Sequence, residues 1–331
     1  MDKSRLLELL PKLSGKTVLV VGDLFLDEYI VGKATRLSRE APVPVLEHQR
    51  TLRLPGGACN PANNIAALEG KALQVGVVGA DQAGRELIKL LVEGGIGVEG
   101  VVVDAARPTT TKTRIVAQGS LRFPQQLARI DRVDRQPIAG TVQSDLLAWL
   151  GKLISRCDAV LVSDYKAGVV NQEVTAECLR LSRNRGVLAT VDSQGDLERF
   201  KGYDLVRCNA QEAEAHLRTE LCREDDFARA TARLLAELDV RAVLVTRGSE
   251  GMSLVARGQD YVHVPAANRS EVYDVTGAGD TVIAVTTLAL AAGASLLEAA
   301  HLANHAAGLV VRKLGNATAT PEELAQAIRT S

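Results

Sequence analysis

The chain has 331 residues, a formal net charge of -1 and 3% aromatic residues. This length allows one large α/β domain or two modest domains, each with a substantial core. The balanced charge and scarce aromatic residues argue against a nucleic-acid-binding surface, which needs basic and aromatic side chains. A small anionic ligand fits this composition better.

The cysteines and the N-terminus bear on where the protein works. Cys59, Cys157, Cys178, Cys208 and Cys222 show no CxxC pair and no regular spacing, which argues against a disulfide framework or a zinc site. Charged residues interrupt positions 1–10, and no run approaches the roughly 18 apolar residues of a membrane span. We expect a cytoplasmic protein without membrane or nucleic-acid partners.

Short apolar runs rich in β-branched residues recur between segments of helical period. They lie at residues 17–21, 73–78, 159–162, 187–191 and 242–245. Such runs are typical of a mostly parallel sheet that is buried on both faces. The sequence therefore predicts a layered α/β domain.

Two segments break this alternation. Residues 29–54 contain Pro42 and Pro44, each of which favours extended backbone at the preceding residue. Residues 109–131 alternate β-formers with charged residues. We expect half-exposed antiparallel strands in both segments, forming a small β-sheet that covers one end of a single domain spanning residues 1–331.

The first predicted strand and the segment after it carry candidate ligand contacts. Asp23 and Asp27 follow that strand, where open α/β sheets place ligands, and their carboxylates suit sugar hydroxyls. A solvated loop is the alternative, above all for Asp27. Gly56 and Gly57 open a helical pattern, so their backbone and Asn60 could approach a ligand closely, with a simple turn as the alternative.

The spacing GxGxxG at residues 95–100 follows a helical pattern and precedes an apolar run. This is the reverse of the strand-to-helix order of a dinucleotide site. It predicts a helix-to-strand turn, and a dinucleotide-dependent oxidoreductase is therefore disfavoured.

Polar residues also follow two later strands. Asn209 and Glu212, one helical turn apart, could hold hydrated Mg²⁺ through water, although helix capping by Asn209 is the alternative. Thr246, Gly248 and Gly251 form a polar glycine loop that suits a phosphate or, equally, a tight turn.

The strongest local motif is the run 276–281, which precedes a small, apolar helical pattern. Small residues at a helix entry expose backbone N–H groups that attract an anion such as phosphate. Asp280 would add a carboxylate to that site, where a base can take a proton from an attacking hydroxyl. The alternative is a helix cap after a glycine turn.

The order of these motifs resembles the PfkB carbohydrate kinases, the ribokinase-like family. The similarity runs from about Val18 to Thr320. Within the family, residues 36–45, 55–60, 126–131 and 304–315 are most similar to the D-glycero-β-D-manno-heptose 7-phosphate kinases of lipopolysaccharide-core precursor synthesis. A catalytically silent sugar- or nucleotide-binding regulator on the same fold is the alternative from another class.

The resemblance implies an ATP-dependent sugar kinase that phosphorylates O1 of the heptose 7-phosphate. Another sugar, phosphosugar or nucleoside is the alternative acceptor. The implied base is Asp280, with Gly277, Ala278 and Gly279 as the anion hole. The implied sugar contacts are Asp23, Asp27, Gly56, Gly57, Asn60 and Arg129.

For the cofactors, the resemblance implies that ATP lies against Thr246, Gly248, Gly251 and Asn304. It implies that Asn209 and Glu212 organise Mg²⁺ and phosphates, with Glu212 acting through water. Asp274 and Thr276 would hold a monovalent cation such as K⁺. The two irregular segments correspond to a lid that also pairs subunits into a homodimer.

The chain departs from the heptose kinases at two loops. Where those enzymes carry Asp-Tyr-Gly-Lys-Gly and Asp-Pro-Lys-Gly, residues 164–168 read Asp-Tyr-Lys-Ala-Gly and residues 192–195 read Asp-Ser-Gln-Gly. One lysine is displaced to Lys166 and another is absent. Lys112, Arg114 and Arg129 could restore positive charge, with solvated surface charge as the alternative. Many members also carry a C-terminal nucleotidyltransferase domain with an HxGH-type signature, which residues 1–331 do not contain.

Overall fold

A computed structural model of the chain describes residues 2–118, 125–268, 272–313 and 315–331. Its main body contains a nine-stranded sheet with the order β13-β12-β11-β10-β9-β8-β1-β4-β5. The strands are β1 (Thr17–Gly22), β4 (Lys71–Gly79), β5 (Gly97–Asp104), β8 (Ala159–Asp164), β9 (Leu188–Ser193), β10 (Leu205–Asn209), β11 (Ala242–Thr246), β12 (Met252–Ala256) and β13 (Val262–Val264). All pairings from β11 to β5 are parallel, and β12 and β13 add antiparallel strands at one edge.

Both faces of this sheet are buried. In β1, Val18 and Val20 belong to one apolar core, and Leu19 and Val21 belong to the other. The alternation follows from the two-residue period of a strand. It explains why the predicted strands are continuous apolar runs. Each predicted run overlaps a strand of the structure, although Val187 precedes β9.

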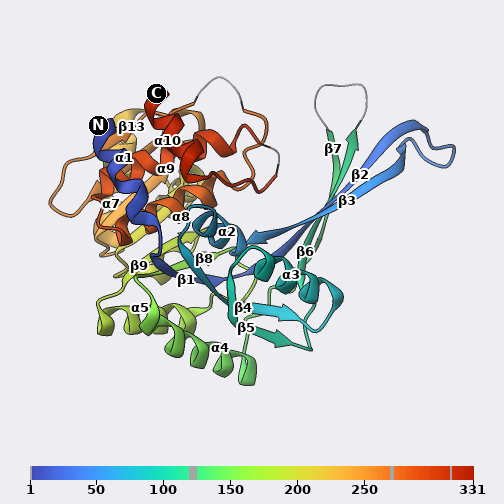
Figure 1. Ribbon diagram of the computed structural model, residues 1–331, viewed down its shortest axis with the longest axis horizontal. Helices are drawn as coiled ribbons and strands as arrows, with labels where there is room; N and C mark the ends of the chain where they lie inside the picture. The colour runs from blue at the N-terminus through green and yellow to red at the C-terminus, as the bar shows by residue number, and fades with distance from the viewer. Residues whose placement is uncertain (1, 119–124, 269–271, 314) are drawn as a thin grey trace.

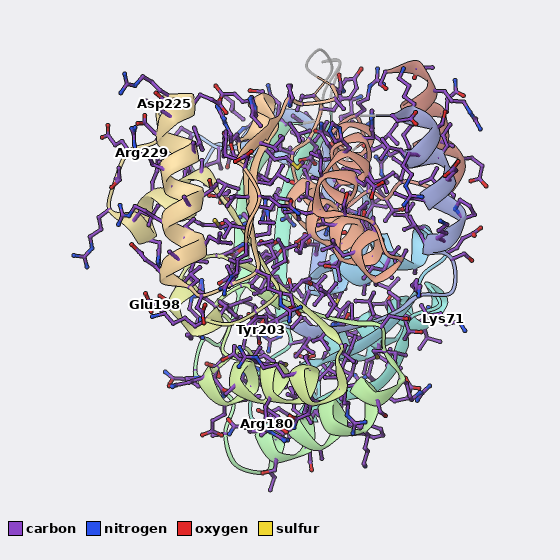
Figure 2. All side chains as sticks on the ribbon, turned by 90° about the vertical axis from the view of Figure 1, so that its left-hand side faces the viewer. Lys71, Arg180, Glu198, Tyr203, Asp225 and Arg229 are labelled. Carbon is purple, nitrogen blue, oxygen red and sulfur yellow. The ribbon has the colours of Figure 1, made fainter. Side chains whose placement is uncertain are left out.

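Helices cover the two faces as separate layers (Figure 1). One core includes residues of α1 (Lys3–Leu13), α2 (Cys59–Ala67), α3 (Gln82–Glu93), α8 (Ala278–Ala291), α9 (Leu296–Val310) and α10 (Pro321–Thr330). The other includes residues of α4 (Gly140–Leu153), α5 (Gln172–Arg185), α6 (Ala210–Leu217) and α7 (Glu224–Glu237). Figure 2 shows Tyr203 in the interior, whereas Arg180 of α5 and Arg229 of α7 lie at the outside.

A second, four-stranded sheet with the order β3-β2-β6-β7 projects from the main body (Figure 1). Its strands are β2 (Leu24–Leu37), β3 (Pro44–Gly57), β6 (Thr110–Gln118) and β7 (Gln125–Arg132). We call these four strands the lid sheet. Residues 119–124 of the second predicted segment lie outside the described residues.

The lid sheet differs from the expectation in two respects. β2 begins at Leu24, directly after β1, so the long hairpin grows out of the central sheet. The pairs β2–β3 and β6–β7 are antiparallel, but β2 and β6 are parallel. This mixed order arises because β6 returns to the lid from the main body rather than from a tight turn with β2.

The run at residues 95–100 is a helix-to-strand turn between α3 and β5, as predicted, with Gly95 at φ +73°. None of the helices in the described ranges is long and apolar enough to cross a bilayer.

Candidate active site at the sheet edge

Neighbouring parallel strands end at one edge of the central sheet and present polar residues there. Asp23 and Tyr165 directly follow β1 and β8. Asp192, Asn209 and Thr246 lie at the carboxyl ends of β9, β10 and β11. In open α/β folds this edge is where ligands bind. The N-terminus of α8 brings the glycine-rich run to the same place.

Asp280 lies in the first turn of α8 and is only 6% exposed. The helix begins after Gly277, whose φ of +77° is a left-handed conformation that glycine adopts without strain. The first N–H groups of a helix have no partner within the helix, so they can bind an anion. Asp280 does not cap the helix, since its carboxylate contacts other elements instead.

Two side chains hold the Asp280 carboxylate. Asn60 of α2 donates through Nδ2 to Oδ2 at 2.8 Å, and the Tyr165 hydroxyl donates to Oδ1 at 2.5 Å. Burial raises the pKa of Asp280 to about 7, and the negative charge of Asp192 adds to the increase. A carboxylate with a pKa near 7 is suited to accept a proton at neutral pH.

Asn60 is itself fixed by α2. Its side-chain oxygen accepts from Asn64 at 3.2 Å, and Asn64 in turn accepts from the Thr281 hydroxyl at 2.9 Å. A Cβ atom at Gly277 would lie 2.4 Å from Nδ2 of Asn60, so only glycine fits there. Gly277 and Asn60, both predicted, therefore meet beside Asp280.

Arg207 is a site residue that we did not predict. It lies buried in β10 and donates to Asp192 at 2.7 Å and to the Thr246 hydroxyl at 2.7 Å. A Cβ at Gly279 would come within 2.6 Å of its guanidinium. Burial lowers the pKa of Arg207, but the attraction of Asp192 outweighs burial, so the pKa is raised and the charge is retained beside the anion hole.

Asp23 organises a loop. Its carboxylate accepts from the backbone N–H groups of Tyr165 at 2.9 Å, Ala167 at 3.1 Å and Val169 at 3.0 Å. These bonds fix the turn that carries Tyr165 to Asp280. Gly57, at φ +56°, approaches the Asp23 carbonyl so closely that a Cβ would lie 2.5 Å from it. A direct sugar contact by Asp23 or Gly57 stays a prediction.

Asp27 is buried and paired, so the solvated-loop alternative is wrong for it. Arg114 of the lid donates to its Oδ1 at 2.7 Å, and Asn316 donates to its Oδ2 at 2.6 Å. A Cβ at Gly56 would lie 2.3 Å from Oδ2, which explains the glycine. Asn316 also was not predicted, and it ties the segment after α9 to the base of the lid.

Arg129 lies on the exposed strand β7 and pairs with Asp131 at 2.9 Å. Lys112 of β6 lies nearer to the base: its Nζ is 4.3 Å from the centroid of the Phe25 ring and 5.1 Å from that of Tyr165. The lid therefore brings positive charge toward the buried carboxylate.

Asn209 and Glu212 form a capping box at the start of α6, which agrees with the alternative prediction that Asn209 caps a helix. Asn209 Oδ1 accepts from the Glu212 N–H at 2.9 Å, and Glu212 Oε2 accepts from the Asn209 N–H at 2.7 Å. Burial raises the pKa of Glu212, and the charge of Asp192 adds to the increase. The Glu212 carboxylate, with Asp192 near it, is the kind of ligand that a hydrated cation prefers.

The loop after β11 is shaped by close contacts. A Cβ at Gly251, φ +96°, would lie 2.1 Å from the Val264 carbonyl oxygen, whereas Gly248, φ +57°, faces open space. Thr246 accepts from Arg207. Asn304 of α9 donates to the Pro265 carbonyl at 2.7 Å, so it anchors the segment that follows β13. Contacts of these residues with ATP stay predictions.

The predicted cation residues lie in the segment before α8. The Asp274 carboxylate accepts from the N–H groups of Thr276 and Gly315, each at 2.9 Å. Within the described ranges, no group of three or more His, Cys, Asp or Glu side chains could hold a metal ion. A monovalent cation here would therefore need carbonyl or water oxygens as well.

The two loops in which the chain departs from the heptose kinases, residues 164–168 and 192–195, lie next to each other. Lys166 has φ +57°, and its Nζ lies so near the other loop that a Cβ at Gly195 would come within 2.7 Å of it. Lys166 Nζ also lies 3.6 Å from Asp196. The displaced lysine thus supplies charge to the loop that has Gln194 instead of lysine.

Comparison with known proteins places the chain in a family. The model of the pfkB family carbohydrate kinases matches residues 16–323. The chain is 43% identical over 307 residues to bifunctional protein HldE of Geobacter metallireducens, which covers 92% of the chain and 61% of that protein. It is 39% identical over 330 residues to bifunctional protein HldE of Trichlorobacter lovleyi, covering 99% of the chain and 66% of that protein. The chain thus spans less than two thirds of these relatives.

Solved structures show the same fold. A ribokinase from Arabidopsis thaliana complexed with ribose and ATP has a TM-score of 0.74 at 20% identity and covers 96% of this chain and 100% of that chain. Phosphofructokinase-2 from Escherichia coli in complex with substrates and products has a TM-score of 0.79 at 20% identity, with 96% and 99% covered. The fold is ribokinase-like, and the chain belongs to the pfkB family of carbohydrate kinases.

Proposed function

We propose that the protein transfers the γ-phosphoryl group of ATP to O1 of D-glycero-β-D-manno-heptose 7-phosphate, with Asp280 as the general base. The observation that carries this proposal is the buried Asp280 carboxylate, held by Asn60 and Tyr165 at the N-terminus of α8. The sugar oxygen attacks the γ-phosphorus while the bond to the β–γ bridging oxygen breaks. The hydroxyl proton passes to Asp280, and ADP leaves.

The N-terminus of α8 stabilises the transferring group. The N–H groups near Gly277, Ala278 and Gly279 face the developing negative charge, and the helix dipole contributes in the same direction. Arg207, kept charged by Asp192, lies against Gly279 and increases the positive potential there. Such positioning and charge are what phosphoryl transfer requires of a protein.

Glu212 is the residue that we propose for Mg²⁺, acting through a water molecule. Mg²⁺ usually keeps several waters, and here it would neutralise the phosphate charge during transfer. Asp274 and Thr276 are proposed for a monovalent cation such as K⁺. The triphosphate would lie along the loops that carry Thr246, Gly248 and Gly251.

The heptose 7-phosphate is proposed as acceptor because the motif order resembles that of the heptose kinases and because the matched curated relatives are HldE proteins. Lys166 supports this acceptor, since it returns a positive charge to the loop at Gly195.

The five cysteines are free, as expected for a cytoplasmic enzyme.

We also propose that the lid pairs two subunits. Large apolar side chains are exposed on it, namely Leu37, Val43, Leu52, Leu127 and Ile130. Exposed apolar side chains gathered on one element are typical of a subunit interface. A second copy that covers them would also hold the lid over the site, where exclusion of water limits the wasteful hydrolysis of ATP.

ADP release tests this proposed function. The purified protein is assayed with Mg·ATP against heptose 7-phosphate, unphosphorylated heptose, ribose, fructose, fructose 6-phosphate and a nucleoside. We expect the highest kcat/KM with heptose 7-phosphate, and a 1,7-bisphosphate product identified by ³¹P NMR. A higher kcat/KM for another acceptor would favour the alternative kinase. Ligand-dependent thermal stabilisation without ADP release would instead favour the silent regulator.

A further inference from the structure

One side chain in the segment between α9 and α10 contacts both strands of the lid hairpin. Asn316 donates through Nδ2 to Oδ2 of Asp27 at 2.6 Å and to the carbonyl oxygen of Pro55 at 3.1 Å. Asp27 lies on β2 and Pro55 on β3, one step apart in the register of the two strands. Asn316 therefore holds the base of the hairpin with a single amide group.

The oxygen of the same amide faces the start of α8. A Cβ atom at Gly277 would lie 3.2 Å from Oδ1 of Asn316. The neighbouring backbone is also tied to this place, because the Gly315 N–H donates to Asp274, and Asp274 accepts from the Thr276 N–H, each at 2.9 Å. The loop that leads into the anion hole is therefore held to the segment that carries Asn316.

Asp27 continues this connection into the lid. Its Oδ1 accepts from Arg114 at 2.7 Å, and both side chains are buried. Arg114 belongs to β6, which pairs with β2 in the lid sheet. Hydrogen bonds between buried charged groups are strong and directional, so they transmit a displacement rather than absorb it. A shift at the base of the lid therefore reaches Asn316.

The amide of Asn316, more than its packing, connects these parts. The side chain is half-buried, so it adds little apolar contact. Glycine lies on both sides of its bond to Asp27: a Cβ at Gly56 would lie 2.3 Å from Oδ2 of Asp27, and a Cβ at Gly277 would crowd the amide oxygen. The bond therefore lies directly against the backbone of the predicted sugar-side glycine pair and of the anion hole.

We propose that Asn316 is a positioning residue that couples the position of the lid to the geometry of the anion hole. The inference rests on the proposed function for the place of the transferring phosphoryl group, at the N-terminus of α8. When an acceptor draws in the base of the lid, the Asn316 amide shifts with Asp27 and Pro55, and the backbone at Gly277 follows. The N–H groups of the anion hole are then aligned only while an acceptor is present, which limits ATP hydrolysis by water.

Coupling between two sites is reciprocal, so binding measurements detect it. The nucleotide probe is Mg·AMP-PNP, an ATP analogue that brings a γ-phosphoryl group without transferring it. The acceptor probe is the member of the acceptor panel that binds most tightly without nucleotide in calorimetry. In the wild type, Mg·AMP-PNP should lower the Kd of the acceptor by about 5- to 150-fold.

Asn316→Ala should lose this coupling. The factor should fall to less than about twofold, whereas the Kd of each ligand alone should change less than about threefold, because the amide touches neither ligand. Asn316→Leu is the second variant, since leucine keeps the volume beside Gly277 but cannot donate. It should lose the coupling as well, which assigns the effect to the two donated hydrogen bonds.

Asn171→Ala is the matched control. The Asn171 amide donates to the Ile138 carbonyl at 3.2 Å and to Gln143 at 2.7 Å, and its oxygen caps α5. These partners belong neither to the lid nor to the loop before α8. The control should therefore lose stability in urea as Asn316→Ala does, yet keep the coupling factor of the wild type.

The outcomes separate this inference from the proposed function. A wild type without coupling, or either Asn316 variant with the wild-type factor, would overturn the positioning role. Loss of coupling in Asn171→Ala as well would assign the effect to lowered stability and overturn it too. Coupling that depends on Asn316, without ADP release from any acceptor, would keep the inference and overturn the proposed function.

Discussion

The sheet edge and the lid handle polar groups in opposite ways. At the edge, Asp280, Asn60 and Arg207 are buried, and each has hydrogen-bond partners at 2.5–2.8 Å. In the lid, β7 is exposed along its whole length. The lid has a small apolar cluster of its own, made of buried Tyr29, Val31 and Val116 with Leu54 packed against them. The side chains at the edge are therefore held in place by the fold, whereas the lid is a sheet with a small core, and its position depends on what it contacts.

This difference suggests a division of tasks, with catalysis at the sheet edge and binding or assembly at the lid. Buried polar groups at the edge cannot be removed singly without leaving a partner unsatisfied, so substitutions there should affect catalysis and stability together. Pairs between exposed lid residues, such as Arg129 and Asp131, stay open to water, so substitutions there should change binding or assembly and leave the fold intact. The following predictions test that division.

The largest effect is expected for Asp280→Asn. The variant keeps the shape and the Asn60 contact but cannot accept the proton, so kcat should fall by about 10²- to 10⁴-fold. The measurement is ADP release with saturating acceptor, with ATP affinity determined by calorimetry. ATP affinity should stay close to that of the wild type. A variant with near wild-type kcat would remove Asp280 from its role as base.

Gly277→Ala should have the next largest effect. Its Cβ would lie 2.4 Å from Nδ2 of Asn60, and moving Asn60 displaces Asp280. Strain of this kind costs about 1–3 kcal/mol, which corresponds to a roughly 10- to 100-fold loss of kcat/KM.

Gly258→Ala is the matched control for Gly277→Ala. Gly258 has φ +75°, nearly the same as the +77° of Gly277, but nothing lies within 4 Å of its Cβ position. Both variants share the cost of a left-handed alanine, and urea denaturation measures it. If both lose activity equally, backbone strain explains the loss and the contact with Asn60 does not.

Tyr165→Phe should have a smaller effect on rate. It removes one hydrogen bond to the base, so kcat should fall about 3- to 10-fold. The bond from Tyr165 lowers the pKa of Asp280, so its loss should raise that pKa further and move the acid limb of the pH–rate profile to higher pH. An unshifted limb would mean that Tyr165 does not act on Asp280.

The smallest effect on folding is expected for Ile130→Asp in the lid. Ile130 is 59% exposed, so the free energy of unfolding should change by less than about 0.5 kcal/mol. The same change should shift a dimer to monomer in analytical ultracentrifugation. Val103→Asp, at a site 53% exposed on β5 and outside the lid, is the control and should leave assembly unchanged. A wild-type monomer would contradict the proposed pairing.

Local patterns predicted most of the main body. The apolar runs marked strands of the central sheet, and the small residues before Asp280 marked the start of α8. The lid was predicted as extended segments, but the parallel pairing of β2 and β6 was not. That pairing depends on where the chain returns from the main body, which no local pattern records.

The contacts of the site were harder to predict because they join distant residues. Tyr165 and Asp280 are 115 positions apart, and Asn316 and Asp27 are 289 apart. Arg207 did carry a signal, since a lone arginine in an apolar run is seldom buried without a partner. The spacing of Asn209 and Glu212, in contrast, was ambiguous, because it suits a metal site and a capping box alike.

The most direct test of Asp280 as the base is the pH profile of kcat/KM, measured for wild type and Asp192→Asn side by side. A carboxyl with a pKa of about 7 is neutral below that pH, so wild-type activity should fall as pH decreases through about 7. Removing the charge of Asp192 removes one cause of the raised pKa, so the acid limb of the variant should lie at lower pH. An acid limb at the same pH in both proteins would assign the titration to the substrates and contradict a role for buried Asp280 as the base.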